Sequence, residues 1–121
     1  MSAIKAIESG MLAEQAVRYF LDRRGFREVT HNYCVHRMGE VDIIVKRDET
    51  LYFVEVRMRR DQSSYGTSED SIVPLKRKRV LTAANHFIQA YGLQSYYTEF
   101  WAAGVSVNTR ERRVRIKMSP F

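Results

Sequence analysis

Two neighbouring stretches of β-branched and aromatic residues each carry an acidic side chain where a buried strand is normally apolar. Asp42 interrupts the apolar run at 41–45, and Glu55 stands between Val54 and Val56. Burying a carboxylate is costly unless a cation or hydrogen-bond donors compensate its charge. Two such carboxylates on adjacent strands therefore indicate a site built around a cation.

The spacing of the two stretches predicts a β-hairpin that brings the two acids together. Its strands are expected at 40–46 and 51–59, with a turn at 47–50. Counting back from the turn puts Asp42 opposite Glu55 and Glu40 opposite Arg57. Opposed Cβ atoms lie ~4.5–5.5 Å apart, and carboxylates that close repel each other unless a divalent cation such as Mg²⁺ lies between them. The alternative is an ordinary network of charge pairs across exposed strands, for example Glu40 with Arg57.

Helical periodicity covers the first part of the chain and the segment that follows Pro74, and strand patterns fill most of the rest. Helices are expected at 4–24 and from 74 to about 92, further strands at 26–35, 99–107 and 113–118, and a loop at 61–71. The last strand alternates apolar and basic residues, which indicates a half-exposed edge strand. The order α-β-β-β-α-β-β predicts an α/β fold with a mixed sheet of about four to five strands flanked by helices.

The composition fits a single domain that spans residues 1–121. The net charge is +6 and the pI about 9.7, and a small basic domain often binds a polyanion, most commonly nucleic acid. No segment approaches the ~18–20 consecutive apolar residues of a membrane span, and the first residues lack the pattern of a signal peptide. The single cysteine, Cys34, excludes an internal disulfide and fits a reducing, cytoplasmic environment.

Glu14 is a third acid at an unexpected position. In the predicted first helix it falls between Ile7 and Leu21, inside the apolar arc. One interpretation is that it pairs with a buried cation or lies close to the metal site. The other is that it marks the boundary of the arc and its carboxylate reaches solvent.

The motif Gly39-Glu40-Val41-Asp42, followed by a spacer and Phe53-Val54-Glu55-Val56-Arg57, resembles the D…E-x-K signature of the PD-(D/E)XK, or restriction-endonuclease-like, superfamily. More specifically, the chain resembles the YraN-like family of small, predicted bacterial endonucleases, which is distantly similar to archaeal Holliday-junction resolvases. The resemblance runs in order from about Gly10 to Ile88. Besides the two motif strands it includes Glu14, Tyr19, Gly25, Asn32, Pro74, Lys76 and Arg79.

This resemblance implies a restriction-endonuclease-like sheet and Mg²⁺-dependent (or Mn²⁺-dependent) hydrolysis of DNA phosphodiester bonds, with structured or branched DNA as one substrate. It implies that Asp42 and Glu55 bind the metal and that Glu14 supports it directly or through water. Glu40 matches the acid of the same motif. The metal would polarise the phosphate and lower the pKa of the attacking water.

The chain departs from the family pattern at the motif lysine and in its late strand. The lysine is replaced by Arg57, which stays protonated and cannot act as a base, although it can stabilise developing negative charge. The usual Arg-Phe-Asp triplet is Glu99-Phe100-Trp101, which suggests altered edge contacts, a changed partner surface or a decayed site. Two functions therefore stay open, an active nuclease and a DNA-binding protein that keeps the fold with impaired catalysis.

Basic residues gather in three stretches, each of which alone is typical of a solvated face. Arg59 and Arg60 end the motif strand, Lys76 and Arg79 lie in the first turns of the second helix, and further arginines and a lysine lie at 110–117. Together they could neutralise several phosphates, which predicts salt-dependent DNA binding. Lys76 and Arg79 are the best candidates, because the resemblance puts their helix beside the metal site. A third alternative is a structural homodimer formed through the strand at 113–118 and Trp101.

Overall fold

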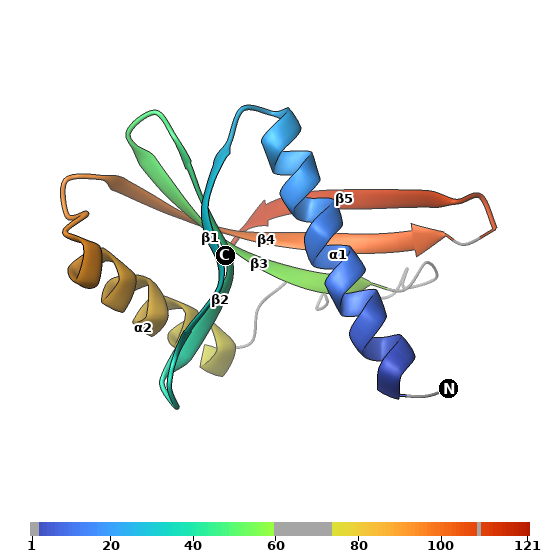
Figure 1. Cartoon of the computed structure of the whole chain (residues 1–121), viewed down its shortest axis with the longest axis horizontal. Coiled ribbons are helices and arrows are strands. Elements are labelled where there is room, and N and C mark those ends of the chain that lie inside the picture. The colour runs from blue at the N-terminus through green and yellow to red at the C-terminus, as the bar shows by residue number, and fades with distance from the viewer. Residues whose placement is uncertain (1–2, 60–73, 109) are drawn as a thin grey trace.

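The elements of the computed structural model follow the predicted order α-β-β-β-α-β-β (Figure 1). The structure describes residues 3–59, 74–108 and 110–121. The elements are α1 (Ala3–Arg23), β1 (Arg27–Val35), β2 (Gly39–Arg47), β3 (Thr50–Arg59), α2 (Pro74–Tyr91), β4 (Tyr97–Asn108) and β5 (Arg113–Pro120). The expected loop at 61–71, Arg60 and the side chain of Arg59 lie outside the described part of the chain.

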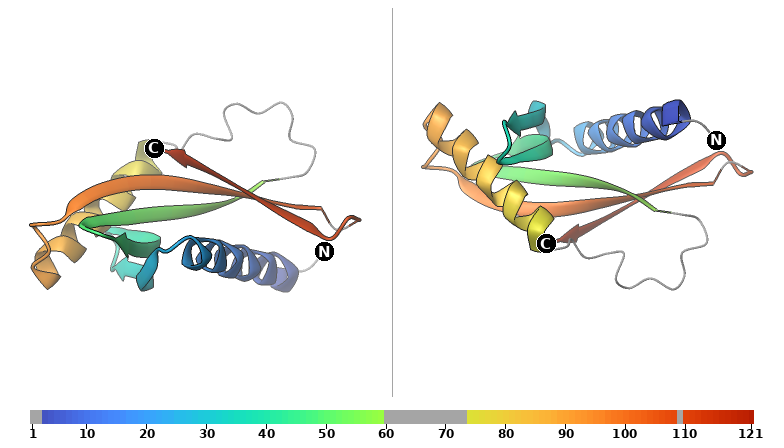
Figure 2. Two further views of the ribbon diagram at one scale, coloured as in Figure 1. Left: turned by 90° about the horizontal axis from the view of Figure 1, so that it is seen from above. Right: turned by 90° about the horizontal axis from the view of Figure 1, so that it is seen from below.

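The five strands form one mixed sheet in the order β1-β2-β3-β4-β5, in which only the β3–β4 pair is parallel. The helix α1 packs on one face and α2 on the other, so the core has two apolar layers (Figure 2). The predicted α/β fold is confirmed, and β5 lies at an edge of the sheet as predicted. Within the described residues, neither helix has the length and apolar character needed to cross a bilayer.

Glycines end both helices in the same way. Gly25 and Gly92 have positive φ angles of 86° and 65°. The amides that follow these glycines donate back to carbonyls of the last turn, Phe26 to Leu21 at 3.1 Å and Leu93 to Ile88 at 2.9 Å. This is the Schellman arrangement, in which a residue without a Cβ turns the chain out of the helix.

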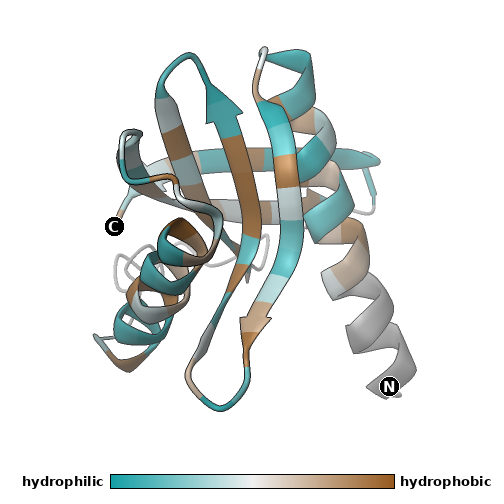
Figure 3. Cartoon of the chain, turned by 60° about the vertical axis from the view of Figure 1, so that its left-hand side comes forward, coloured by the Kyte–Doolittle hydropathy of each residue, from teal (hydrophilic) through white to brown (hydrophobic). Residues whose placement is uncertain are grey.

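The hairpin of β2 and β3 forms the centre of the sheet. Lys46 pairs with Leu51, as predicted, although the turn is shorter than the four residues expected, because Arg47 already pairs with Thr50. The middle of β2 is hydrophobic and its ends are hydrophilic (Figure 3). The buried side chains of the hairpin divide between the faces, with Ile43, Val45 and Val54 under α1 and Ile44, Leu51 and Phe53 under α2.

Candidate metal and nucleic-acid site

The described pairing between β2 and β3 ends just before the two acids. The last pair in the ladder is Ile43 with Val54. One residue further on, Asp42 Oδ2 accepts a hydrogen bond of 2.8 Å from the backbone N–H of Val56. A side chain thus replaces a strand-to-strand backbone contact, and the Asp42 carboxylate is close enough to Glu55 to raise the pKa of that carboxyl group. The predicted closeness of the two acids is confirmed.

Glu40 does not follow the hairpin register that places it opposite Arg57. The described β2–β3 ladder ends at Ile43 with Val54, before it reaches Glu40, whose backbone pairs on the other side with Cys34 of β1. Its carboxylate Oε1 lies 3.5 Å from both Nε and Nη2 of Arg79 on α2. The prediction counted on a continuous ladder, and the ladder is interrupted where the Asp42 carboxylate binds β3. Glu40 therefore contacts the second helix.

The Glu55 side chain is only 1% exposed, and its two oxygens have different surroundings. Oε2 lies 2.8 Å from Nζ of Lys76, whereas Oε1 is buried and has no hydrogen-bond partner. Burial, and then the neighbouring Asp42, raise the pKa of Glu55 to about 8, and Lys76 acts in the opposite direction. A buried carboxylate oxygen without a donor is costly, so this position would be stabilised by an added cation.

Lys76 reaches Glu55 from the first turn of α2. Burial lowers the pKa of Lys76, but its contact with Glu55 and the charges of Asp42 and Glu40 outweigh this and raise the pKa overall. The ammonium therefore stays protonated beside three acids. The sequence predicted Lys76 as a phosphate-binding residue, and the structure places it on the Glu55 carboxylate itself.

Gly39 explains why α2 comes so close to β2. A Cβ built at Gly39 would lie 2.0 Å from the backbone carbonyl oxygen of Arg79. Only a residue without a side chain fits against the helix backbone at this distance. The glycine of the motif thus sets the position of α2, which carries Arg79 to Glu40 and Lys76 to Glu55.

Glu14 lies on the α1 side of the same cluster and is half-buried, close enough to Asp42 for that charge to act on it. Burial and then the charge of Asp42 raise its pKa, while a hydrogen bond from Asn32 lowers it. Asn32 lies on β1 between the pairs formed by His31 and Tyr33, and its φ is 53°. The sequence interpretation gave Asn32 no role, although the resemblance includes it. A polar residue in mid-strand beside the position of Asp42 is the signal that could have identified it.

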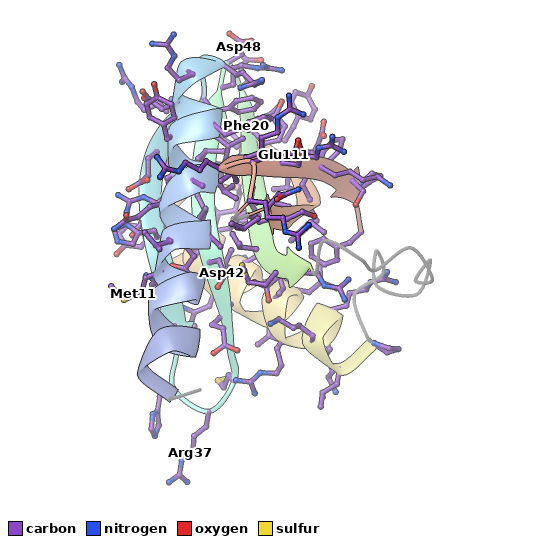
Figure 4. All side chains as sticks on the ribbon, turned by 90° about the vertical axis from the view of Figure 1, so that its right-hand side faces the viewer. Met11, Phe20, Arg37, Asp42, Asp48 and Glu111 are labelled. Carbon is purple, nitrogen blue, oxygen red and sulfur yellow. The ribbon has the colours of Figure 1, made fainter. Side chains whose placement is uncertain are left out.

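The donor set suits a hard cation that keeps most of its ligands from solvent or substrate. Within the described ranges, no group of three or more His, Cys, Asp or Glu side chains is arranged to hold a metal ion, so Glu14 does not complete a cage with Asp42 and Glu55. Mg²⁺ commonly takes one or two carboxylates and fills its other positions with water and phosphate. The unpartnered Glu55 Oε1 beside Asp42 fits such an ion. Asp42 lies between α1 and α2 when the molecule is viewed from the side (Figure 4).

The other residues singled out in the sequence lie on β3 and β4. Arg57 follows Glu55 by two residues, on the same face of β3, and is half-buried. Glu99 and Trp101 lie on β4, between β3 and β5, and Glu99 Oε1 accepts a 2.9 Å hydrogen bond from Trp101 Nε1. The two departures from the family triplet therefore contact each other. They lie beside Tyr52 and Val54 under α1, away from the Lys76 side of the sheet.

Comparison with known proteins identifies the family. The model of a family described as "Uncharacterised protein family UPF0102" matches residues 13–116. The chain is 41% identical over 85 residues to a UPF0102 protein of Nitrosococcus oceani, which covers 70% of this chain and 67% of that protein. It is 31% identical over 115 residues to a UPF0102 protein of Syntrophus aciditrophicus (95% and 89% covered) and 33% identical over 112 residues to one of Alkaliphilus metalliredigens (93% and 96%). The chain therefore belongs to the UPF0102 family.

Proposed function

We propose that this chain is a Mg²⁺-dependent endonuclease that hydrolyses phosphodiester bonds in DNA, including structured or branched DNA. The observation that carries the proposal is the state of Glu55. Its carboxylate is fully buried, one oxygen contacts Lys76, and the other has no partner beside Asp42. Such an arrangement is costly as a purely structural feature and useful as a cation site. The resemblance to YraN-like and restriction-endonuclease-like enzymes supports the same function.

Each residue has a distinct role in this proposal. Asp42 and Glu55 would hold Mg²⁺ (or Mn²⁺), which polarises the phosphate and lowers the pKa of a bound water, and Glu14 would support it through water. Lys76 donates a hydrogen bond toward the reacting phosphate and compensates the acids. Arg57 would stabilise negative charge that develops on the phosphate, because its guanidinium stays positively charged. For the same reason it cannot act as the general base. Arg79 holds Glu40 in place.

The charge of the chain supports DNA as the partner. The net charge is +6, and two basic side chains of α2 contact acids of the motif, Lys76 at Glu55 and Arg79 at Glu40. Binding through phosphates would be strongly salt-dependent. Arg59 and Arg60 belong to the same proposal by their positions in the sequence. A cytoplasmic location, inferred from the single cysteine, and a homodimer through the edge of β5 are secondary parts of the proposal.

Metal-dependent cleavage tests the proposal. Supercoiled plasmid and a labelled branched duplex are incubated with the protein and Mg²⁺ or Mn²⁺, with EDTA as the metal-free arm. We expect nicking that needs the metal and that Asp42→Ala abolishes. The matched control is Glu49→Ala, which removes an exposed acid from the turn of the same hairpin and should leave cleavage unchanged. Cleavage that persists in Asp42→Ala, or in EDTA, would rule the proposal out.

The second candidate is a DNA-binding protein with impaired catalysis. Arg57 favours it, because the family lysine at this position is replaced by a residue that cannot lose a proton. This candidate predicts salt-sensitive DNA binding that is indifferent to Mg²⁺, without cleavage. Arg57→Lys separates the two cases. If Arg57 limits an otherwise competent site, the substitution raises the cleavage rate, and if the rate stays at zero the site is impaired elsewhere.

A further inference from the structure

Beyond Glu55, the same face of the sheet carries a strip of small residues on β4, with Arg57 on the β3 side and three basic residues on the β5 side. The strand pairing arranges the residues of this face in rows that run across the sheet. Two rows cross β3, β4 and β5, namely Glu55–Ala102–Ser119 and Arg57–Gly104–Lys117. Two further rows cross β4 and β5, namely Ser106–Arg115 and Asn108–Arg113. The β4 residues of these rows are small or uncharged. Glu55 and Ala102 are buried, so the rows from Gly104 outward outline a track whose floor is β4 and whose β5 side is cationic.

Alternation along the strands shows that the rows share one face. Phe53 on β3, Phe100 on β4 and Phe121 after β5 belong to the core layer under α2. Every second residue from these positions points to the same side, which includes Glu55 and Arg57. Val105 and Ile116 alternate with the track residues and pack in the layer under α1. The β4–β5 hairpin extends well beyond α2 along this face (Figures 1 and 2).

The far end of the track is hollow. A hollow of about 180 Å³ lies at the end of the β4–β5 hairpin, lined by Ser106, Asn108, Glu111, Arg113 and Arg115. Asn108 organises the turn here, because its Nδ2 donates to Glu111 Oε2 and its Oδ1 accepts from the amides of Arg110 and Glu111, all at 3.1 Å. The one acid in the hollow is therefore bound to an amide. The arginines Arg113 and Arg115 are exposed.

The dimensions suit a single polynucleotide backbone. Successive residues on one face of a strand are ~6.6–6.8 Å apart. Two spacings between neighbouring strands place β3 and β5 ~9.5 Å apart. Arg113 and Arg115 are exposed on the β5 side of this space, where phosphates of one strand could meet them. Phosphate contacts position a strand without reading its sequence.

We infer that this track binds one unpaired strand of DNA through its phosphates, next to the bond that is cleaved at Asp42 and Glu55. The inference rests on the proposed function, since it takes the acid pair as the place of cleavage. It goes beyond that function by assigning a substrate strand and a path. Substrates with a single-stranded arm would be preferred over blunt duplexes, because the ~9.5 Å between β3 and β5 admits one unpaired strand and is less than the width of a duplex.

A pair of substitutions on neighbouring residues tests the path. Ser106→Glu and Val107→Glu add the same charge one residue apart on β4, but on opposite faces of the sheet. Binding of a fluorescein-labelled oligothymidylate is measured by anisotropy in EDTA, so that cleavage plays no part. We expect Ser106→Glu to weaken binding much more than Val107→Glu. Equal effects would place the strand elsewhere.

The salt dependence gives a second, independent measurement. For single strands the slope of log K against log[salt] changes by about 0.7 for each phosphate contact. Arg113→Gln with Arg115→Gln should therefore reduce the slope by about 1.4. Arg23→Gln with Arg27→Gln removes the same charge from exposed positions at the end of α1 and the start of β1 and should leave the slope unchanged.

The outcomes separate this inference from the function on which it rests. If the wild type binds no DNA even at low salt, both are wrong. If it binds and cleaves with Mg²⁺ but each track variant behaves like its control, the nuclease proposal stands and the track is wrong. If blunt duplex binds more tightly than oligothymidylate and loses as much affinity in Ser106→Glu, the track exists for duplex DNA and the single-strand assignment is overturned.

Discussion

The two ends of the β2–β3 hairpin are held together by different interactions. Near the turn, the strands pair from Arg47 with Thr50 to Ile43 with Val54, and the apolar side chains between them are buried on both faces. At the other end the described ladder stops, and a carboxylate, a backbone amide and a lysine from α2 take over. The first end follows the general rules of strand pairing, and the second depends on particular side chains.

This difference indicates where stability and function lie in the molecule. The apolar end gains free energy by removing side chains from water, so it tolerates little loss of volume. The acidic end contains a buried carboxylate whose burial is unfavourable in the absence of a cation. A region that is locally unfavourable and well positioned is typical of a functional site. Substitutions at the two ends should therefore differ in their effects on stability.

Phe53→Ala should have the largest effect, because it removes the centre of the apolar end. Phe53 is fully buried, stacks on Phe100 with ring centroids 5.2 Å apart and meets Phe87 edge-on at 6.4 Å. Truncation of such a side chain lowers the free energy of unfolding by about 3–5 kcal/mol. Urea unfolding measures it, with Val107→Ala as an exposed strand control that changes stability by less than about 0.5 kcal/mol. Similar losses in both variants would contradict the assigned core.

Glu55→Gln should change how stability depends on pH. In the metal-free protein the pKa of Glu55 is raised to about 8 from an ordinary value of 4.5. Between these values the unfolded chain has released the proton and the folded chain still holds it. The contribution of the protonated Glu55 to the free energy of unfolding is therefore complete below pH 4.5. It falls as the pH rises toward 8, by at most about 1.4 kcal/mol per pH unit.

The Gln variant removes this titration, so its stability curve should be flatter and should lie above that of the wild type near pH 8. Thermal unfolding across this pH range, without metal, measures the difference. Glu49→Gln provides the control, because Glu49 is exposed in the turn at the other end of the hairpin. If wild type and Glu55→Gln give parallel curves, the carboxyl group of Glu55 is not held in its protonated form by burial.

The sequence predicted the apolar end well, because alternation and turn spacing are local properties. Lys46 pairs with Leu51 even though the turn is shorter than expected. At the acidic end the closeness of Asp42 and Glu55 was also correct, but the partner of Glu40 was not. Counting residues assumes a continuous ladder, and it cannot represent a side chain that accepts a hydrogen bond from the opposite strand.

The contact between Lys76 and Glu55 could not be found by counting, since it joins residues on different elements through the packing of α2. The sequence placed Lys76 near the site only through the family resemblance. The physical signal is Gly39, which permits the close approach of the helix. A glycine can begin a strand for several reasons. At Gly39 the reason is the nearby backbone carbonyl of Arg79, which only the folded structure reveals.

Gly39→Ala tests that approach and should have an intermediate effect. The added methyl group would meet the Arg79 carbonyl oxygen, so α2 must shift, at a cost of about 1–3 kcal/mol. The shift should also weaken the contact between Lys76 and Glu55, which raises the pKa of Glu55 further, so the loss of stability with rising pH would extend to higher pH. Gly10→Ala is the matched control, because a Cβ there meets nothing within 4 Å. In the interior of α1 this change should stabilise the protein by about 0.5–1 kcal/mol.

Asp42→Asn should have the smallest effect on stability, because two consequences oppose each other. The amide oxygen of asparagine can still accept the hydrogen bond from Val56 N–H, and the loss of charge relieves the repulsion with Glu55. The net change should stay within about 1 kcal/mol, and the apparent pKa of Glu55 should fall toward its ordinary value. Asp42→Ala relieves the same repulsion but leaves the Val56 amide without its acceptor, which costs about 1–3 kcal/mol. The asparagine variant should therefore be the more stable of the two in urea unfolding at neutral pH. Equal stability would mean that the contact with Val56 does not hold the acidic end of the hairpin, and that the packing of α2 alone positions the two carboxylates.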